Sequence, residues 1–394
     1  MKNKIVNFSK MAVALFAILG AAAGCAPTTN PLDPSVGPSV EPSVEPSVEP
    51  STEPEKEYWN ETYRNPLIPR GSNGQKYMDE APDPSIVRGD DGYWYAVTTG
   101  NGGGKMFRSE NCCTWKLHLD RVIPRPTWGD HKGGDTPNVW APDLIKIQDK
   151  WIYYYSLSGW GNAIGIGYAV ADAVEGPYTD MGKLITCEEI GLENAIDPCI
   201  YVEDDAIYMA IGSFQGIDMI ELEADGMSVK GDPKTTKVLI AGSYGGWNGA
   251  ETEGSYIIKK DDYYYYFGSM GTCCVGADST YKVVVARSKS IAGPYVDDQK
   301  RTMVGDGGAG KVVCWASAGN GKYYGPGHNS VFQDDAGDYW LFYHAFTKED
   351  SFARRHMMMD KLYWDEDGWP YIVGEGKFKP SYMEEMDGPR FFDE

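Results

Sequence analysis

The chain has 394 residues and carries a formal net charge of −21 at pH 7. This charge argues against nucleic acid or an anionic membrane surface as the partner, whereas a neutral polymer is compatible with it. The 27 tyrosines and 12 tryptophans could offer flat surfaces to sugar rings. In an all-β protein, however, most aromatic side chains belong to the core and to cross-strand pairs.

The first 25 residues have the pattern of a secretory signal. MKNK supplies basic charge, MAVALFAILGAAAG is an apolar stretch too short to span a bilayer as a stable helix, and AAGC ends at Cys25. Cys25 is placed as in a lipoprotein cleavage box, although Ala22 stands where leucine is usual. We therefore expect export and a lipid anchor on Cys25; an ordinary signal peptide with an incidental cysteine is the alternative.

Residues 26–57 are predicted to be a linker. Proline recurs about every fourth residue in PLDPSVGPSVEPSVEPSVEPSTEPEKE, with glutamate interleaved. Such a sequence buries little and favours extended, polyproline-like conformations. Residues 58–394 remain for one domain, which is large for a single compact core but suits a β domain built from repeats.

The cysteines do not form a recognisable metal or redox motif. None of the spacings among the eight residues resembles a zinc site or a CxxC pair. Export permits disulfides, but the sequence leaves the state of the adjacent pairs Cys112–Cys113 and Cys273–Cys274 open.

Five segments of the body share one pattern: a polar leading residue, a short strand, an acidic or amide-bearing turn, and a second strand rich in Tyr, Trp and Phe. They are DPSIVRGDDGYWYAVTTG from Asp83, DLIKIQDKWIYYYSLSG from Asp143, DPCIYVEDDAIYMAIGSF from Asp197, EGSYIIKKDDYYYYFGSM from Glu253 and HNSVFQDDAGDYWLFYHAF from His328. Each is predicted to be a β-hairpin. Further hairpins are predicted at 164–180 and 283–298, which share the letters GPY.

The spacing of these segments predicts an all-β fold, a five-bladed β-propeller, in which the first strand of each blade lines the central axis. The five leading residues, four carboxylates and a histidine, would then converge at one end of one channel. For any single position a turn-forming role is an equal alternative, because Asp before Pro and Glu before Gly are common at turns.

Clustered carboxylates repel one another, which keeps one of them protonated near neutral pH. Glycoside hydrolysis needs this division, with one protonated acid and one ionised carboxylate. Such a cluster could also bind a cation such as calcium through its oxygens. Zinc is disfavoured, because only one of the five residues is a histidine.

Six motifs across residues 75–375 resemble the arabinanases of glycoside hydrolase family 43, and they occur in that family's order. They are DPSIV, VWAPDLI, NAIDP, AETEGSYIIKKDDYYYYFGS, CCVGADSTYKVVVARS and GPGHNS. The resemblance implies a five-bladed propeller, in agreement with the repeats, and an inverting enzyme that cleaves α-1,5-L-arabinan internally. The paired cysteines before STY favour arabinan over xylan as the substrate.

The resemblance also implies roles for three acids. Asp83 matches the general base that activates water, Glu253 the general acid, and Asp197 the third acid, which positions Glu253 and raises its pKa. Glu251 lies two residues before Glu253, so strand periodicity does not exclude it. Alignment of the five segments favours Glu253, although Gly254 follows it where the family often has Pro or Ala-Pro.

Other residues are expected near these acids. Trp140 and Asp143 in WAPD are predicted to bind substrate, with a structural role for Asp143 as the alternative. His328 in GPGHNS resembles the residue that arabinanases place at a calcium ion, so Ca²⁺ is expected near it; a satisfied buried histidine is the alternative. The remaining histidines, His344 among them, are interpreted as surface or core residues.

Two other functions remain open. One is an exo-acting arabinofuranosidase or β-xylosidase of the same family, and the other is a non-catalytic carbohydrate-binding propeller. The expected partners are arabinan or arabino-oligosaccharides, with membrane contact only through the lipid on Cys25, and no nucleic acid.

Overall fold

The computed structural model describes residues 57–100, 102–129, 134–245, 251–305 and 310–392. The predicted signal (1–25) and, except for Glu57, the predicted linker (26–57) lie outside these described residues. Within the described ranges, no helix has the length and apolar character needed to cross a membrane.

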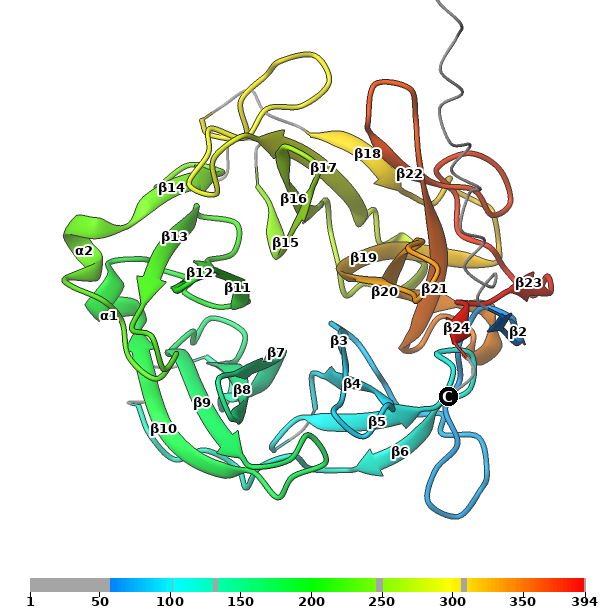
Figure 1. Ribbon diagram of the computed structural model, residues 1–394, viewed down its shortest axis with the longest axis horizontal. Coiled ribbons are helices and arrows are strands. Elements are labelled where there is room, and N and C mark those ends of the chain that lie inside the picture. The colour runs from blue at the N-terminus through cyan, green and yellow to red at the C-terminus, as the bar shows by residue number, and fades with distance from the viewer. Residues whose placement is uncertain (1–56, 101, 130–133, 246–250, 306–309, 393–394) are drawn as a thin grey trace, which may run out of the picture. The chain divides into compact units, whose positions relative to one another are not determined.

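Five four-stranded antiparallel sheets surround a central axis, and each is built from four consecutive strands (Figure 1). Blade I contains β3 (Ser85–Arg88), β4 (Trp94–Thr98), β5 (Lys105–Ser109) and β6 (Lys116–Leu119). Blade II contains β7 (Asn138–Ile147), β8 (Lys150–Ser158), β9 (Gly165–Ala171) and β10 (Thr179–Thr186). Blade III contains β11 (Cys199–Glu203), β12 (Ala206–Ile211), β13 (Ile217–Leu222) and β14 (Val238–Ala241). Blade IV contains β15 (Glu253–Lys260), β16 (Tyr263–Met270), β17 (Lys282–Ser288) and β18 (Lys311–Cys314), and blade V contains β19 (Tyr323–Gln333), β20 (Tyr339–Thr347), β21 (Arg355–Trp364) and β22 (Pro370–Ile372).

The predicted five-bladed propeller is confirmed, and so are its five inner hairpins, which are β3–β4, β7–β8, β11–β12, β15–β16 and β19–β20. The first strand of each blade lies nearest the axis, as expected (Figure 1). The hairpin predicted over 283–298 differs from the structure. Val296 there forms only isolated bridges to Arg287 and Thr302, and the fourth strand of blade IV is β18, further along the chain.

The second strand of each blade is the most apolar, because it is covered on both faces by neighbouring blades. Tyr153, Tyr154 and Tyr155 of β8 are all fully buried although they alternate in direction, as are Tyr266 and Phe267 of β16. The aromatic-rich second strands therefore form the core between blades.

Segments near the two ends of the domain close the ring. β1 (Tyr58–Trp59) pairs with β24 (Phe391–Phe392), and β2 (Thr62–Tyr63) pairs with β23 (Met386–Asp387). Asn65 then joins the early segment to blade V: its amide donates to the carbonyl of Met359 (2.7 Å) and accepts the Met359 N–H (2.9 Å). Four short helical turns complete the described structure: α1 (Cys187–Ile190), α2 (Pro233–Thr236), η1 (Gly276–Asp278) and η2 (Lys348–Asp350).

At the axis, a hydrogen bond from a backbone N–H to a side chain joins each blade to the one before it. In every blade, one residue at or just before the inner strand has a left-handed φ, and its N–H donates to a side chain of the preceding blade. The five pairs are Asp83 N to His344 Nδ1 (3.0 Å), Ala141 N to Thr99 Oγ1 (2.7 Å), Asp197 N to Ser156 Oγ (2.9 Å), Gly254 N to Asp197 Oδ2 (3.0 Å) and His328 N to Ser269 Oγ (2.7 Å). We refer to these five contacts as the axial joints.

The axial joints correct the alignment of the repeats. Asp83, Asp197 and His328 occupy the same joint position in their blades, as the sequence alignment indicated. Asp143 and Glu253 do not: Ala141 and Gly254 take that position in blades II and IV. The alignment was wrong there because the left-handed position has no common residue type, so neither composition nor alternation marks it.

Asp143 of blade II lies outside the axial cavity and forms hydrogen bonds to blades I and III. Its carboxylate accepts the Ser85 hydroxyl of blade I (2.7 Å), the Ile200 N–H of blade III (2.8 Å) and its neighbour's N–H at Leu144 (3.0 Å). Burial raises its pKa, while these three donors lower it. Asp143 is not among the residues of the described chain that line the axial cavity, so its position favours the structural role.

Replacing Asp143 by alanine is therefore expected to destabilise the domain strongly. Three buried donors would lose their acceptor, which should cost about 3 to 5 kcal/mol of the free energy of unfolding. Urea denaturation measures this, with Asp172→Ala as the control, because Asp172 is an exposed carboxylate that forms a surface ion pair with Lys150. The control should change stability by less than about 0.5 kcal/mol. Equal losses of unfolding free energy in the two variants would contradict the structural role of Asp143.

Candidate active site

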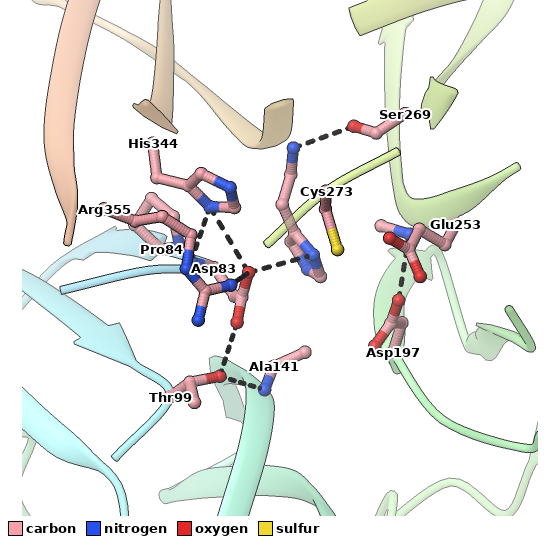
Figure 2. A network of polar contacts seen from close by, with 12 residues as sticks. Asp83, Pro84, Thr99, Ala141, Asp197, Glu253, Ser269, Cys273, His344 and Arg355 are labelled. Carbon is pink, nitrogen blue, oxygen red and sulfur yellow. Dashed lines mark hydrogen bonds and ion pairs between the residues drawn. The ribbon is translucent and has the colours of Figure 1, made fainter. Parts of the chain in front are cut away.

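A cavity of about 930 Å³ lies at the axis and is lined by residues of all five blades. Among them are the predicted site residues Asp83, Trp140, Asp197, Glu253 and His328. Figure 2 shows Asp83 with its partners on one side and the Asp197–Glu253 pair on the other. The structure thus brings together every predicted site residue except Asp143.

Asp83 lies beside one guanidinium, two imidazoles and a hydroxyl donor. Its Oδ1 lies 3.5 Å from Nη1 of Arg355, 3.3 Å from Nδ1 of His344 and 3.4 Å from Nδ1 of His328. Its Oδ2 accepts the Thr99 hydroxyl at 2.6 Å. Burial alone would raise the pKa of Asp83, but Arg355 and the two imidazoles hold it well below its usual range. Asp83 is therefore an ionised carboxylate under ordinary conditions.

Glu253 has the opposite character. Burial raises its pKa to about 7, the nearby Asp83 contributes in the same direction, and hydroxyls from Tyr281 and Ser213 partly oppose the shift. Tyr281 donates to Oε1 and Ser213 to Oε2, both at 2.8 Å. Glu253 is therefore a carboxylic acid that keeps its proton close to neutral pH.

Asp197 is paired with Glu253. Burial raises its pKa well above the usual range, and the negative charges of Glu253 and Asp83 raise it further, whereas the N–H of Gly254 lowers it. The two neighbouring acids disfavour simultaneous ionisation, so the pair retains a proton that a lone exposed carboxylate would lose.

His328 faces the cavity as a neutral imidazole. Burial lowers its pKa to about 4, although the neighbouring Asp83 opposes that shift. Among the described residues no group of three or more His, Cys, Asp or Glu side chains is arranged to hold a metal ion. A cation at His328 would therefore have to take its other ligands from water and not from a cage of protein oxygens.

His344 corrects one interpretation of the sequence. It was grouped with surface or core histidines, and it is indeed buried, yet its ring contacts the carboxylate of Asp83. A signal existed in the hairpin pattern: His344 lies in the last part of the second strand of blade V, where blades II and IV have Ser156 and Ser269.

Trp140 and a disulfide form part of the cavity wall. The Trp140 ring meets the exposed Trp160 edge to face, with centroids 5.4 Å apart. Cys273 and Cys274 are bonded to each other, whereas Cys112 and Cys113 are free thiols. Both pairs had been left open by the sequence.

Tyr281, Ser213, Arg355 and Thr99 were not identified from the sequence. Each acts on a carboxyl group elsewhere in the chain, and although Tyr281 is the tyrosine of STY in one of the six motifs, that motif does not indicate which group its hydroxyl contacts. Arg355 is also held by Glu80, with Nε and Oε1 3.2 Å apart. Only the three-dimensional arrangement relates these residues to the acids.

The arrangement can perform acid–base chemistry at one bond. An ionised carboxylate can take a proton from water, while a protonated carboxyl group in the same cavity gives one to a departing oxygen. Such a pair serves the hydrolysis of an acetal, in which both transfers occur across a sugar ring.

Comparisons with known proteins agree with this chemistry. A family model described as glycosyl hydrolases family 43 matches residues 77–370. The extracellular exo-alpha-(1->5)-L-arabinofuranosidase ArbA of Cellvibrio japonicus (strain Ueda107) is 32% identical over 339 residues, covering 80% of this chain and 94% of that protein. The extracellular endo-alpha-(1->5)-L-arabinanase 1 of Bacillus subtilis (strain 168) is 30% identical over 296 residues, covering 73% and 86%.

A solved structure supports the same relationship. The Cellvibrio cellulosa alpha-L-arabinanase complexed with arabinohexaose superposes with a TM-score of 0.63 at 28% identity, covering 75% of this chain and 96% of that one. Since the family model spans well over half of the sequence, the chain belongs to glycosyl hydrolase family 43 and is a glycoside hydrolase.

Proposed function

We propose that the protein is an exported, inverting hydrolase that cleaves α-1,5-L-arabinan internally. The observation that carries this proposal is the pairing of an ionised Asp83 with a protonated Glu253 in one cavity. Support for the substrate comes from the relatives, whose names specify α-1,5-linked arabinan or arabinose units. Exo action is the second candidate, because ArbA, an exo-acting relative, shares 32% identity over 339 residues.

In this mechanism water attacks the anomeric carbon directly. Asp83 accepts a proton from the water as its oxygen bonds to that carbon, and Glu253 gives its proton to the glycosidic oxygen as the bond to the leaving sugar breaks. The configuration inverts because a single displacement occurs and no glycosyl-enzyme intermediate forms. Asp197 acts beside Glu253, where its charge favours the protonated form of the acid. Trp140 contributes an apolar face to the sugar chain.

Location follows from the sequence and from the relatives. ArbA and arabinanase 1 are both named as extracellular. A lipid on Cys25 would hold the domain at the envelope, with residues 26–57 as the spacer.

The decisive experiment is to digest debranched arabinan with residues 57–394 and to size the products over time. An endo-acting enzyme should lower the average chain length quickly and yield mixed short oligosaccharides. Release of a single small product from barely shortened polymer would establish exo action instead. No cleavage of arabinan, xylan or their oligosaccharides would leave the binding-module alternative.

Three variants should accompany this digestion. Asp83→Asn and Glu253→Gln are each expected to lose about 10²- to 10⁴-fold in rate, the usual contribution of a general base or acid. Glu251→Gln is the matched control, since Glu251 is not among the cavity-lining residues of the described chain, and it should retain most of the activity. Loss of activity in this control but not in Glu253→Gln would reassign the acid.

The pH dependence of kcat/KM should reflect the protonation states of Asp83 and Glu253. The acid must be protonated, so the rate should fall about tenfold per pH unit above about 7, where Glu253 loses its proton. Asp83 should cause no fall between pH 4 and 7, because its pKa lies well below its usual range. A rate that rises from pH 6 to pH 9 would contradict these assignments.

We also propose that Ca²⁺ binds at His328. The neutral imidazole in the cavity wall supports this, and the cation would add positive charge near the acids. Removal of Ca²⁺ with EGTA should lower both activity and melting temperature, and added Ca²⁺ should restore them. In His328→Ala neither quantity should respond to Ca²⁺. A wild-type melting temperature that is the same in EGTA and in excess Ca²⁺ would refute the site.

A further inference from the structure

Tyr281, the tyrosine of STY in the sequence, lies between the two halves of the site. It immediately precedes β17, is 2% exposed, and donates its hydroxyl to Oε1 of Glu253 at 2.8 Å. Burial and the charge of Glu253 raise the pKa of this hydroxyl well above its usual range. The hydroxyl therefore keeps its proton and remains a donor.

The ring of Tyr281 extends toward the base. It stacks on the imidazole of His344 with centroids 5.9 Å apart and an interplanar angle of 17°. The Nδ1 of His344 in turn accepts the N–H of Asp83 and lies 3.3 Å from Oδ1 of the same residue. One continuous set of contacts thus connects Glu253 to Asp83.

The backbone of blade V confines the ring. A Cβ atom at Gly327 would lie 2.1 Å from Cδ1 of Tyr281, so the ring fits there only because residue 327 has no side chain. With His344 and the β19 backbone packed against it, the ring has little freedom to shift.

We propose that Tyr281 is the positioning residue that sets the placement of the general acid relative to the general base, through its hydroxyl on Glu253 and its ring on His344. The inference rests on the proposed function, because it assigns those roles to the two carboxyls. An inverting displacement depends on their separation, since water must fit between the base and the sugar.

The hydroxyl also influences the proton of Glu253. Both carboxyl oxygens accept a hydroxyl, from Tyr281 and Ser213, which prevents rotation of the group. Both bonds stabilise the ionised form. Without the Tyr281 hydroxyl, Glu253 should hold its proton to higher pH and be a weaker acid.

The test compares Tyr281→Phe with wild type on debranched arabinan across pH 5 to 9. Tyr281→Phe keeps the ring and should move the alkaline limb of kcat/KM upward by about half to one pH unit, with a fall in kcat of about tenfold. Tyr281→Leu also removes the stack and should lower kcat by at least about a further tenfold at nearly unchanged KM.

Two controls separate positioning from a structural role. Tyr295→Phe removes a buried hydroxyl beyond the other end of β17, which donates to the carbonyl of Ile291 at 2.8 Å, and it should leave the alkaline limb in place. Ser213→Ala removes the other donor to Glu253 and should move the limb in the same direction as Tyr281→Phe. Melting temperatures of all variants show whether they are folded.

The outcomes distinguish this inference from the proposed function. An inactive wild type refutes the function itself. The role of Tyr281 is refuted if the wild type is active and the alkaline limb of kcat/KM does not move in Tyr281→Phe. It is also refuted if that limb moves equally in Tyr295→Phe. If Tyr281→Leu does not fold, the comparison of Tyr281→Phe with Tyr295→Phe still decides the question.

Discussion

The axial joints are the contacts on which both the ring and the site depend. In four of them the acceptor belongs to a residue in the last part of the second strand of the preceding blade or directly after it: Thr99, Ser156, Ser269 or His344. The corresponding place in blade III is Gly212, which has no side chain, and a Cβ there would lie 2.2 Å from the carbonyl oxygen of Gly216. The carboxylate of Asp197 replaces the missing acceptor and binds the N–H of Gly254. The acid pair Asp197 and Glu253 is therefore located where the fivefold pattern is broken.

This placement explains how the fold controls proton affinity. Asp83 and Asp197 occupy joint positions themselves, and Glu253 directly precedes one. Asp83 faces Arg355 and two imidazoles, which stabilise its charge, whereas the two acids at the joint between blades III and IV are buried beside each other. The same local geometry, repeated around the axis, thus gives carboxyl groups of opposite character because their neighbours differ.

The sequence predicts the five inner hairpins, but it does not predict the joint positions or the residues that tune the acids. Alternating strands and acidic turns identify the five inner hairpins, because each hairpin carries its own pattern. The left-handed joint position cannot be recognised in the sequence, because the five blades place Asp, Ala, Asp, Gly and His there. The sequence alignment therefore matched Asp143 and Glu253 with Asp83, although neither is a joint residue. Tyr281 and Arg355 begin or directly precede third strands, far in sequence from the carboxyls they contact. Contacts between segments distant in sequence have no local pattern, so the partners of the acids emerge only from the fold.

The ionised state of the proposed base, Asp83, depends on closure of the ring between blades I and V. Blades I and V are remote in sequence and are held together by paired terminal strands and by Asn65. Asp83 belongs to blade I, while His344, Arg355 and His328, which keep it ionised, all belong to blade V. The base is thus assembled across the seam at which the two ends of the domain meet. A slight opening of that seam would separate Asp83 from the charge of Arg355 and from the two imidazoles while each sheet stayed intact. Catalytic activity would then depend on closure of the whole ring.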